Sequence, residues 1–361
     1  MKILHIAKID NNKSSGVNVV VPQRILVQSK KENVYFLNLN DCIIDELKGL
    51  QLEYKINNQT IYNVCKTIGK IDIVVIHEVN NVENIKIYKQ LLKMNIPYII
   101  VPHGEITESA LSQKKIKKKV AYLLFFNKFI LNAKGIQCLS KEELNTIKIK
   151  IPNKIIIGNG VNIPIIKKKQ FNENEINITY IGRLDPHHKG LDSLIESVSK
   201  IKNKLHKENV SINLYGPYIE DYNKQLNDLL IKFNLNNFIK IHNSVFAKEK
   251  EKVLLESDLF IQTSRHEGLP TGILEAMGIG LPCIITKGTN MADILQKYDA
   301  GYYAGNTIDS IRDAIIKSID DKMNWPQKGE NGIKLVEENF TWDLIIQKEL
   351  NYYRSIVDNY E

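Results

Sequence analysis

Short apolar runs rich in β-branched residues alternate with helical patterns along most of this chain. They occur at KILHIA, DIVVIH, PYIIVP, GIQCLS, INITYIG, SINLYG, FIKIHN, DLFIQTS and PCIITK. This alternation is typical of parallel sheets built from βαβ units. We expect one α/β sheet with strands near residues 2–6, 72–77, 98–102 and 135–139, and a second with strands near 176–181, 211–215, 238–242, 258–263 and 282–286.

The length of 361 residues favours two domains over one large barrel. Gly158 and Gly160 interrupt the pattern, and a polar, lysine-rich stretch typical of a linker follows them. After residue 338, apolar residues recur at roughly helical spacing and predict a final amphipathic helix. They are Phe340, Leu344, Ile345, Leu350 and Tyr353. We therefore expect domains at 1–165 and 166–338, and a C-terminal helix at 339–361.

Composition excludes several classes of protein. No apolar run reaches the roughly 18 residues that a membrane-spanning helix needs. The N-terminal MKILHIAKID is broken by His5 and Lys8 and indicates a buried strand rather than a secretory signal. The cysteines show no close pairing, which argues against a disulfide framework or a zinc site. We expect a cytoplasmic protein.

Charge is divided unevenly along the chain. Residues 1–160 carry 24 Lys and Arg against 13 Asp and Glu, a net +11, whereas the remainder carries 25 against 28, a net −3. The first half is therefore expected to meet an anionic partner.

Two carboxylates eight positions apart mark the segment HEGLPTGILEAMGIGLP. Glu267 follows a predicted strand, and Glu275 lies in the first turns of the next helix. Ligands of open parallel sheets bind at the carboxyl ends of the strands. The backbone amides around Leu269 to Gly272 would point at the same crevice, and a helix N-terminus suits a pyrophosphate. Gly268, Leu269, Pro270 and Thr271 are the candidate donor contacts in this segment. The pair is expected to hold a sugar and a ribose on either side of this anion site.

Two cations accompany another strand end in ITYIGRLDPHHKGLDSLIESV. Arg183 and Lys189 lie in or beside the loop after the strand, where they could bind two phosphates and neutralise a leaving nucleoside diphosphate. The alternative is a pair of solvated loop charges. The adjacent His187 and His188 lack further ligands at metal-binding spacing, so a solvated turn is expected there.

Together these strings resemble the donor site of the large retaining glycosyltransferase family with the GT-B fold and the E-x7-E signature, a glycosyltransferase family 4-like group exemplified by bacterial polysaccharide-building enzymes. The resemblance rests on E-G-L-P, I-L-E-A-M and G-L-P, and on G-R-L followed by K-G. It implies two Rossmann-like domains facing across a cleft, with the C-terminal helix crossing back to the N-terminal domain. It also implies that Glu267 contacts the transferred sugar, that Glu275 contacts the ribose, and that Arg183 and Lys189 bind the diphosphate.

The resemblance extends to further donor contacts. Gly182 lies in the phosphate-binding segment, Gly216 follows a strand in LYGPY, and Val245 or Phe246 would flank the base of the nucleotide. Gly16 resembles the first glycine-containing loop of the family, although the fuller glycine pair is replaced by Ser15 and Gly16. For Gly216 a plain turn is the alternative.

The N-terminal half offers a candidate acceptor site. His103 and Gly104 follow the strand PYIIV directly. The resemblance implies that this histidine touches the donor sugar near the acceptor hydroxyl, and the sequence leaves open whether it relays a proton. Glu105 and Glu108 are candidate acceptor contacts, with helix capping as the alternative.

The only dense lysine cluster precedes an aromatic run at YLLFF. It consists of Lys114, Lys115, Lys117, Lys118 and Lys119. A basic, aromatic-rich helix can lie on the inner face of an anionic membrane or meet a polyprenyl-diphosphate-linked acceptor, whereas the plain alternative is a core helix with a solvated first turn.

The expected reaction is transfer of a hexose-type sugar from a UDP- or GDP-linked donor to a glycan or lipid-linked saccharide, with retention of configuration, in synthesis of a bacterial surface polysaccharide such as capsule or O-antigen. We expect no metal, since no Asp-x-Asp motif stands at a plausible site. The alternatives are a sugar-nucleotide epimerase of similar fold, a nucleic-acid binder suggested by the basic charge, and a catalytically silent carbohydrate-binding relative. No nucleic-acid recognition motif accompanies the lysines.

Overall fold

The computed structural model describes residues 1–13, 15–54, 56–105, 126–147, 151, 153–172 and 174–360. The chain forms two compact units: unit 1 comprises Met1–Gly160 and Trp342–Glu361, and unit 2 comprises Val161–Thr341. The divisions therefore fall after residues 160 and 341, a few residues from the expected 165 and 338. Where the chain enters and leaves unit 2, Val161 and Thr341 pair in a parallel bridge.

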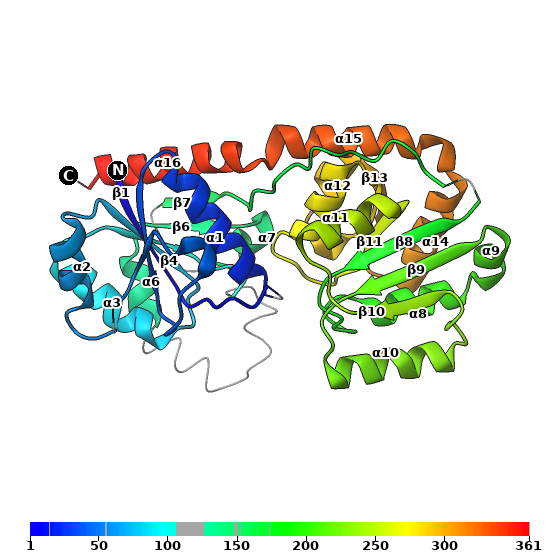
Figure 1. Ribbon diagram of the computed structural model, residues 1–361, viewed down its shortest axis with the longest axis horizontal. Coiled ribbons are helices and arrows are strands. Elements are labelled where there is room, and N and C mark those ends of the chain that lie inside the picture. The colour runs from blue at the N-terminus through cyan, green and yellow to red at the C-terminus, as the bar shows by residue number, and fades with distance from the viewer. Residues whose placement is uncertain are drawn as a thin grey trace. The chain divides into compact units, whose positions relative to one another are not determined.

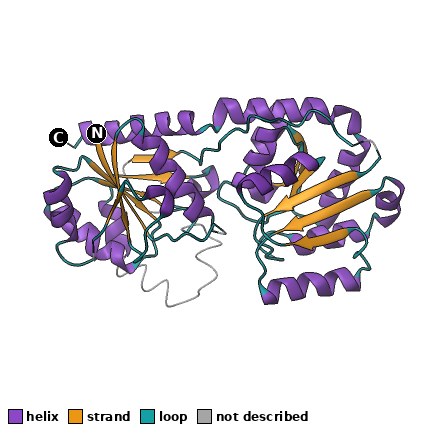
Figure 2. Ribbon diagram, viewed as in Figure 1, coloured by secondary structure: helices purple, strands orange, loops and turns teal. Residues whose placement is uncertain are grey.

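Unit 1 contains a seven-stranded sheet in the order β3-β2-β1-β4-β5-β6-β7, in which all recorded pairings are parallel. Figure 2 shows helices packed around it. Its strands are β1 (Lys2–Ala7), β2 (Asn33–Asn38), β3 (Gln51–Leu52), β4 (Ile73–His77), β5 (Tyr98–Val101), β6 (Gly135–Cys138) and β7 (Asn153–Ile156). Its described helices are α1 (Gly16–Ser29), α2 (Thr60–Ile68), α3 (Val82–Lys93), α6 (Asn127–Asn132), α7 (Lys141–Thr146) and α16 (Trp342–Asp358). The central strands are almost wholly buried, as a sheet covered on both faces requires.

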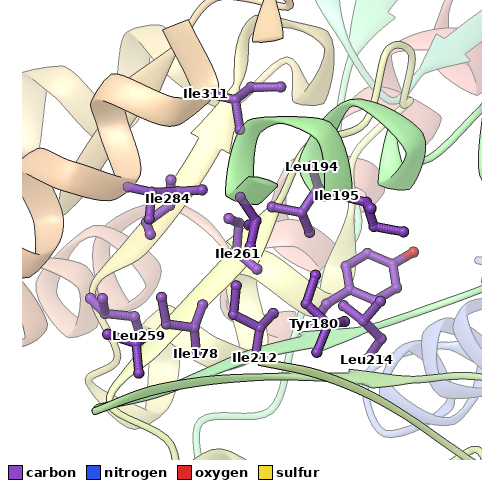
Figure 3. Close-up of a cluster of buried hydrophobic side chains, with 14 of the residues drawn as sticks. Ile178, Tyr180, Leu194, Ile195, Ile212, Leu214, Leu259, Ile261, Ile284 and Ile311 are labelled. Carbon is purple, nitrogen blue, oxygen red and sulfur yellow. The ribbon is translucent and has the colours of Figure 1, made fainter. Parts of the chain in front are cut away.

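Unit 2 contains a six-stranded parallel sheet in the order β10-β9-β8-β11-β12-β13. Its strands are β8 (Ile176–Ile181), β9 (Val210–Tyr215), β10 (Ile239–His242), β11 (Leu259–Gln262), β12 (Cys283–Thr286) and β13 (Gly301–Ala304). Its α-helices are α8 (Leu191–Ser199), α9 (Lys202–Lys207), α10 (Glu220–Lys232), α11 (Ala247–Glu256), α12 (Thr271–Ile279), α13 (Ala292–Tyr298), α14 (Ile308–Asp320) and α15 (Trp325–Asn339). Ile178, Ile212 and Ile261 pack one face of the sheet against Leu194 of α8 (Figure 3).

All nine expected strands are present, and four further strands were missed: β2, β3, β7 and β13. Three of these lie at sheet edges, where strands are short and partly exposed and so lose the continuous apolar run of a central strand. β7 is the clearest case, since its four residues are all at least partly exposed.

The last helix, α16, packs against α1 of unit 1 (Figure 1). The predicted return of a C-terminal helix to the first domain is therefore confirmed. The predicted buried face is only partly right: Ile345, Leu350 and Tyr353 are buried, whereas Leu344 is exposed and Ile346 takes its place in the interior.

Candidate functional site

The carboxyl ends of β8 and β11 carry the strongest candidate residues in unit 2. These strands are neighbours, although β9 follows β8 in the chain and lies on its other side, so the strand order reverses between them. Such a switch point is where open parallel sheets bind ligands. The loop after β8 supplies Arg183 and Lys189, and the loop after β11 supplies Glu267. The fold therefore brings together the cation and the carboxylate that the sequence suggested.

Glu267 is held by three side chains. Its Oε1 forms an ion pair with Lys189 Nζ and accepts hydrogen bonds from Ser264 Oγ at 2.7 Å and Gln262 Nε2 at 2.9 Å. Burial by itself would raise the pKa of this carboxyl, but the Lys189 ammonium and the hydrogen bonds from Lys189 and Ser264 lower it below its ordinary value. Glu267 is thus an ionised, fixed hydrogen-bond acceptor, suited to binding hydroxyl groups.

The backbone at Gly190 positions Lys189. Gly190 has a φ of +65°, and a Cβ added there would lie 2.1 Å from the carbonyl oxygen of Thr263, just beyond β11. Only glycine permits both the left-handed conformation and this approach. Thr263 Oγ1 also donates to the carbonyl of Gly190 at 3.0 Å. The loop after β8 is thereby tied to the end of β11.

Arg183 differs from Lys189 in being exposed. Its Nη2 lies 3.8 Å from Asp185 Oδ2, and Asp185 Oδ1 accepts a hydrogen bond from the backbone nitrogen of His188 at 2.8 Å. Asp185 therefore shapes the loop while the guanidinium extends from it, at the same sheet edge as Lys189. His187 is exposed and His188 half-buried. Across the described residues, no group of three or more His, Cys, Asp or Glu side chains could hold a metal ion.

Helix α12 begins at Thr271, directly after the Glu267 loop. Pro270 is buried, whereas Gly268, Leu269 and Thr271 are half-buried. Asn290 Nδ2 donates to the carbonyl of Glu267 at 2.5 Å and braces this loop. Glu275 lies on α12 and forms an ion pair with Lys250 of α11. Glu275, the expected ribose contact, is therefore paired with a lysine that the sequence did not single out.

Two glycines at the ends of β8 and β9 pack closely. A Cβ on Gly216 would lie 2.2 Å from the carbonyl oxygen of Gly182, so Gly216 cannot be replaced without backbone movement. A Cβ on Gly182 would lie 2.7 Å from the hydroxyl oxygen of Tyr180 and 3.1 Å from its Cζ. Val245, in the loop before α11, is buried, and the neighbouring Phe246 is exposed. The contacts of these residues with a nucleotide stay predictions.

In unit 1, His103 follows β5 with a φ of +53°, and Gly104 follows with a φ of +86°. The Gly104 nitrogen donates to Glu143 Oε1 at 2.6 Å, which fixes the turn. His103 Nε2 lies 2.9 Å from Nδ1 of His77, the last residue of β4. Burial, with a smaller effect of Arg24, lowers the pKa of His103 to about 3. His103 is therefore a neutral imidazole at physiological pH.

Glu105 caps the neighbouring loop. Its Oε2 accepts hydrogen bonds from the backbone nitrogens of Val79 at 2.5 Å and Asn80 at 3.0 Å. Beside it, burial first and the Glu105 charge second raise the pKa of Glu78 to about 7. Glu105 thus has a structural role in this loop, and its contact with an acceptor stays a prediction.

The remaining predictions concern Gly16, Glu108 and the lysine cluster. Gly16 is the exposed first residue of α1, and a Cβ there would meet nothing within 4 Å. Glu108 lies outside the described residues, as do the five lysines between 114 and 119. No helix within the described part of the chain is long and apolar enough to span a membrane.

Comparisons with known proteins concern the family and the fold. Residues 162–334, nearly all of unit 2, match the family model described as "Glycosyl transferases group 1". Unit 2 therefore matches a glycosyltransferase family, and the chain has the GT-B fold. It is 27% identical over 222 residues to an Escherichia coli protein, "UDP-Gal:alpha-D-GlcNAc-diphosphoundecaprenol alpha-1,3-galactosyltransferase", which corresponds to 55% of this chain and 54% of the relative.

Solved structures confirm the GT-B fold for nearly the whole chain. Sucrose-phosphate synthase from Thermosynechococcus elongatus superimposes with a TM-score of 0.79 at 14% identity, covering 99% of this chain and 100% of the other. The Anabaena HepE protein in complex with UDP and glucose superimposes with a TM-score of 0.76 at 16% identity, covering 98% and 100%. In sequence, however, the match spans between half and two thirds of the length of the first curated relatives.

Several side chains of this GT-B site escaped the sequence reasoning. Ser264 and Gln262 were hidden because they lie within or just after an apolar strand, DLFIQTS. Lys250 is one of several lysines in α11 and carries no signal of its own. His77 and Glu78 could have been found from the sequence. Both lie at the carboxyl end of the predicted strand DIVVIH, and the rule that selected His103 at another strand end applies to them as well.

Proposed function

We propose that this protein is a retaining, metal-independent glycosyltransferase that moves a hexose-type sugar from a nucleoside-diphosphate sugar to a hydroxyl of a glycan or lipid-linked saccharide. The observation that carries the proposal is the convergence of Lys189 and Glu267 at the switch point of unit 2, beside the N-terminus of α12. A cation, an ionised carboxylate and a helix N-terminus at one strand edge match the parts of a sugar diphosphate.

Each residue has a distinct role in the proposed mechanism. The donor diphosphate takes Lys189 and Arg183 as its counter-charges, and Glu267 accepts hydrogen bonds from the sugar hydroxyls. The bond between the anomeric carbon and the diphosphate oxygen breaks, and the cations stabilise the negative charge that the diphosphate gains. The acceptor oxygen then bonds to the anomeric carbon on the same face, and its proton passes to the leaving phosphate.

A uridine nucleotide is the favoured carrier. The name of the Escherichia coli relative specifies UDP-Gal and a diphosphoundecaprenol-linked acceptor, and the Anabaena structure contains UDP. A lipid-linked acceptor would place this protein at the inner face of the cell membrane, in assembly of a surface polysaccharide. The excess of positive charge in residues 1–160 fits an anionic lipid diphosphate.

The donor site is tested by Glu267→Gln and Lys189→Ala in a transfer assay with UDP-sugars. Each variant should lower kcat by about 100-fold or more, the usual effect of removing one group that stabilises a transition state. The matched controls are Asp309→Asn and Lys200→Ala, which break an exposed ion pair of 2.9 Å elsewhere in unit 2. Wild-type rates in folded Glu267→Gln and Lys189→Ala variants would refute the assignment.

The stereochemistry and the metal requirement are tested on the wild-type enzyme. NMR of the product should show the same anomeric configuration as the donor, and the rate should be unchanged in EDTA. An inverted anomer, or activity lost in EDTA and restored by Mn²⁺ or Mg²⁺, would contradict these two parts of the proposal. Incubation of the donor alone identifies an epimerase, because only an epimerase would form a new sugar without an acceptor.

A further inference from the structure

Three histidines form a hydrogen-bonded row in unit 1. His5 lies on β1, His77 ends β4, and His103 follows β5. His5 Nδ1 lies 2.9 Å from His77 Nε2, and His77 Nδ1 lies 2.9 Å from His103 Nε2. His5 and His77 are fully buried, whereas His103 is half-buried. The row therefore leads from the interior of unit 1 toward its surface.

The inner end of the row reaches a buried carboxylate on α16. His5 Nε2 lies 2.8 Å from Gln28 Oε1, and Gln28 Nε2 donates to Glu349 Oε2 at 2.7 Å. Glu349 Oε1 accepts from Gln137 Nε2 at 2.7 Å and lies 3.0 Å from Arg24 Nε. Burial raises the pKa of Glu349, and the Arg24 charge and the two glutamine amides oppose this shift. The two amide donors and the nearby Arg24 charge favour the ionised carboxylate.

The carboxylate sets the direction of every bond in the row. An ionised carboxylate only accepts, so Gln28 turns its NH2 to Glu349 and its oxygen to His5. His5 must then donate from Nε2, which leaves its Nδ1 as an acceptor. His77 donates to that atom from Nε2, and by the same step His103 donates from Nε2 to His77 Nδ1. His103 Nδ1 is left without a proton.

The direction is preserved because each ring carries one proton. Burial is the main cause that lowers the pKa of His5 to about 3, and it lowers the pKa of His77 well below its ordinary value. The pKa of His103 is lowered in the same way. None of the rings is therefore expected to gain a second proton near neutral pH. A second proton on any ring would remove an acceptor and so destroy the direction of the row.

We propose that Glu349, through Gln28, His5 and His77, fixes His103 in the tautomer protonated at Nε2, so that Nδ1 accepts a hydrogen bond from a substrate hydroxyl. This inference rests on the proposed transfer reaction and deepens it. Gln28, His5 and His77 are positioning residues, since they act only through His103. The neutral Nδ1 is an acceptor and cannot donate a proton.

The tautomer is read directly by NMR of the ¹⁵N-labelled imidazoles in the full chain. The expected result for the wild type is a proton on Nε2 of His103 and none on Nδ1 between pH 6 and 8. In Gln28→Leu, His5 loses the acceptor for its Nε2 proton, so a substantial population of the reversed tautomer should appear at His103. A proton on His103 Nδ1 in the wild type, or an unchanged tautomer in Gln28→Leu, overturns the proposal.

Kinetics separate positioning from stability. His77→Leu should lower kcat/KM about 10-fold or more, the usual effect of about 1.4 kcal/mol, whereas His77→Gln should restore most of the rate because its amide can donate to His5 and accept from His103. Ile76→Ala, at a buried position beside His77, controls for loss of stability. Equal losses in His77→Leu, His77→Gln and Ile76→Ala overturn the positioning role. The NMR result needs no turnover, so an absence of transferase activity in the wild type would refute the proposed function separately.

Discussion

At the scale of single residues, the environment of a side chain decides its chemistry more than its identity does. Glu267 and Glu78 both follow parallel strands, yet Lys189 lowers the pKa of Glu267, whereas burial and Glu105 raise that of Glu78 to about 7. The strand-end rule locates such carboxylates, but it does not reveal which charge will face them. That neighbour comes from another loop in each case.

The raised pKa of Glu78 predicts a pH-dependent cost to stability. A carboxyl whose folded pKa exceeds its unfolded value destabilises the protein above the folded pKa, and this cost disappears as pH falls below the unfolded pKa of about 4.3. Glu78→Gln should therefore raise the free energy of unfolding by about 1 kcal/mol or more at pH 8, and by little at pH 4.5. Urea denaturation of both proteins at the two pH values measures this. A gain that is the same at both pH values would contradict the raised pKa.

At the scale of elements, α16 is joined to α1 by a buried ion pair. Arg24 and Glu349 are both fully buried, with Nε and Oε1 3.0 Å apart. Gln28 on α1 and Gln137 on β6 bond to the same carboxylate. The helix that returns from unit 2 is thus joined to unit 1 by polar as well as apolar contacts, and the register of α16 on α1 is specified.

Removing one partner of this pair should cost more than removing both. Glu349→Leu leaves the Arg24 charge buried and unpaired, for which about 3–5 kcal/mol is typical. The double variant Arg24→Met with Glu349→Leu should recover a large part of that loss, because two apolar side chains replace two buried charges. Chemical denaturation of the single and double variants measures the coupling. A double variant whose loss equals the sum of the two single losses would exclude this coupling.

At the scale of the whole molecule, the two units are unequal in sequence continuity. Unit 2 is one uninterrupted segment with its own core, whereas unit 1 is assembled from Met1–Gly160 and Trp342–Glu361. Trp342 packs against Gly160, where a Cβ would lie 2.5 Å from the indole ring. The C-terminal segment is therefore part of unit 1 in structural terms.

This topology predicts different behaviour for two fragments. Residues 161–341 should fold alone and unfold cooperatively, because they contain a complete sheet and its covering helices. Residues 1–160 should be markedly less stable, because they lack the apolar and ionic partners on α16. Circular dichroism and urea titration of each fragment, with 1–160 mixed with a 342–361 peptide as the control, measure this. A 1–160 fragment as stable as unit 1 in the full chain would contradict the expectation.

The sequence by itself determined the α/β class, the two-domain organisation and nine of the thirteen strands in the described residues, and it singled out Lys189 and Glu267, which form an ion pair. These predictions rest on local signals, because apolar periodicity and the residues at strand ends can be recognised within short segments of sequence. The missed β3, β7 and β13 are edge strands, whose partial exposure removes that signal.

Only the tertiary structure decided which side chains meet. Ser264 contacts Glu267, and Lys250 on the neighbouring helix contacts Glu275. Glu349 contacts Gln28, which lies 321 positions away in the sequence. Such contacts depend on strand order and helix packing rather than on spacing along the chain. For this reason the sequence contains His5, His77 and His103 but does not indicate that they form a hydrogen-bonded row.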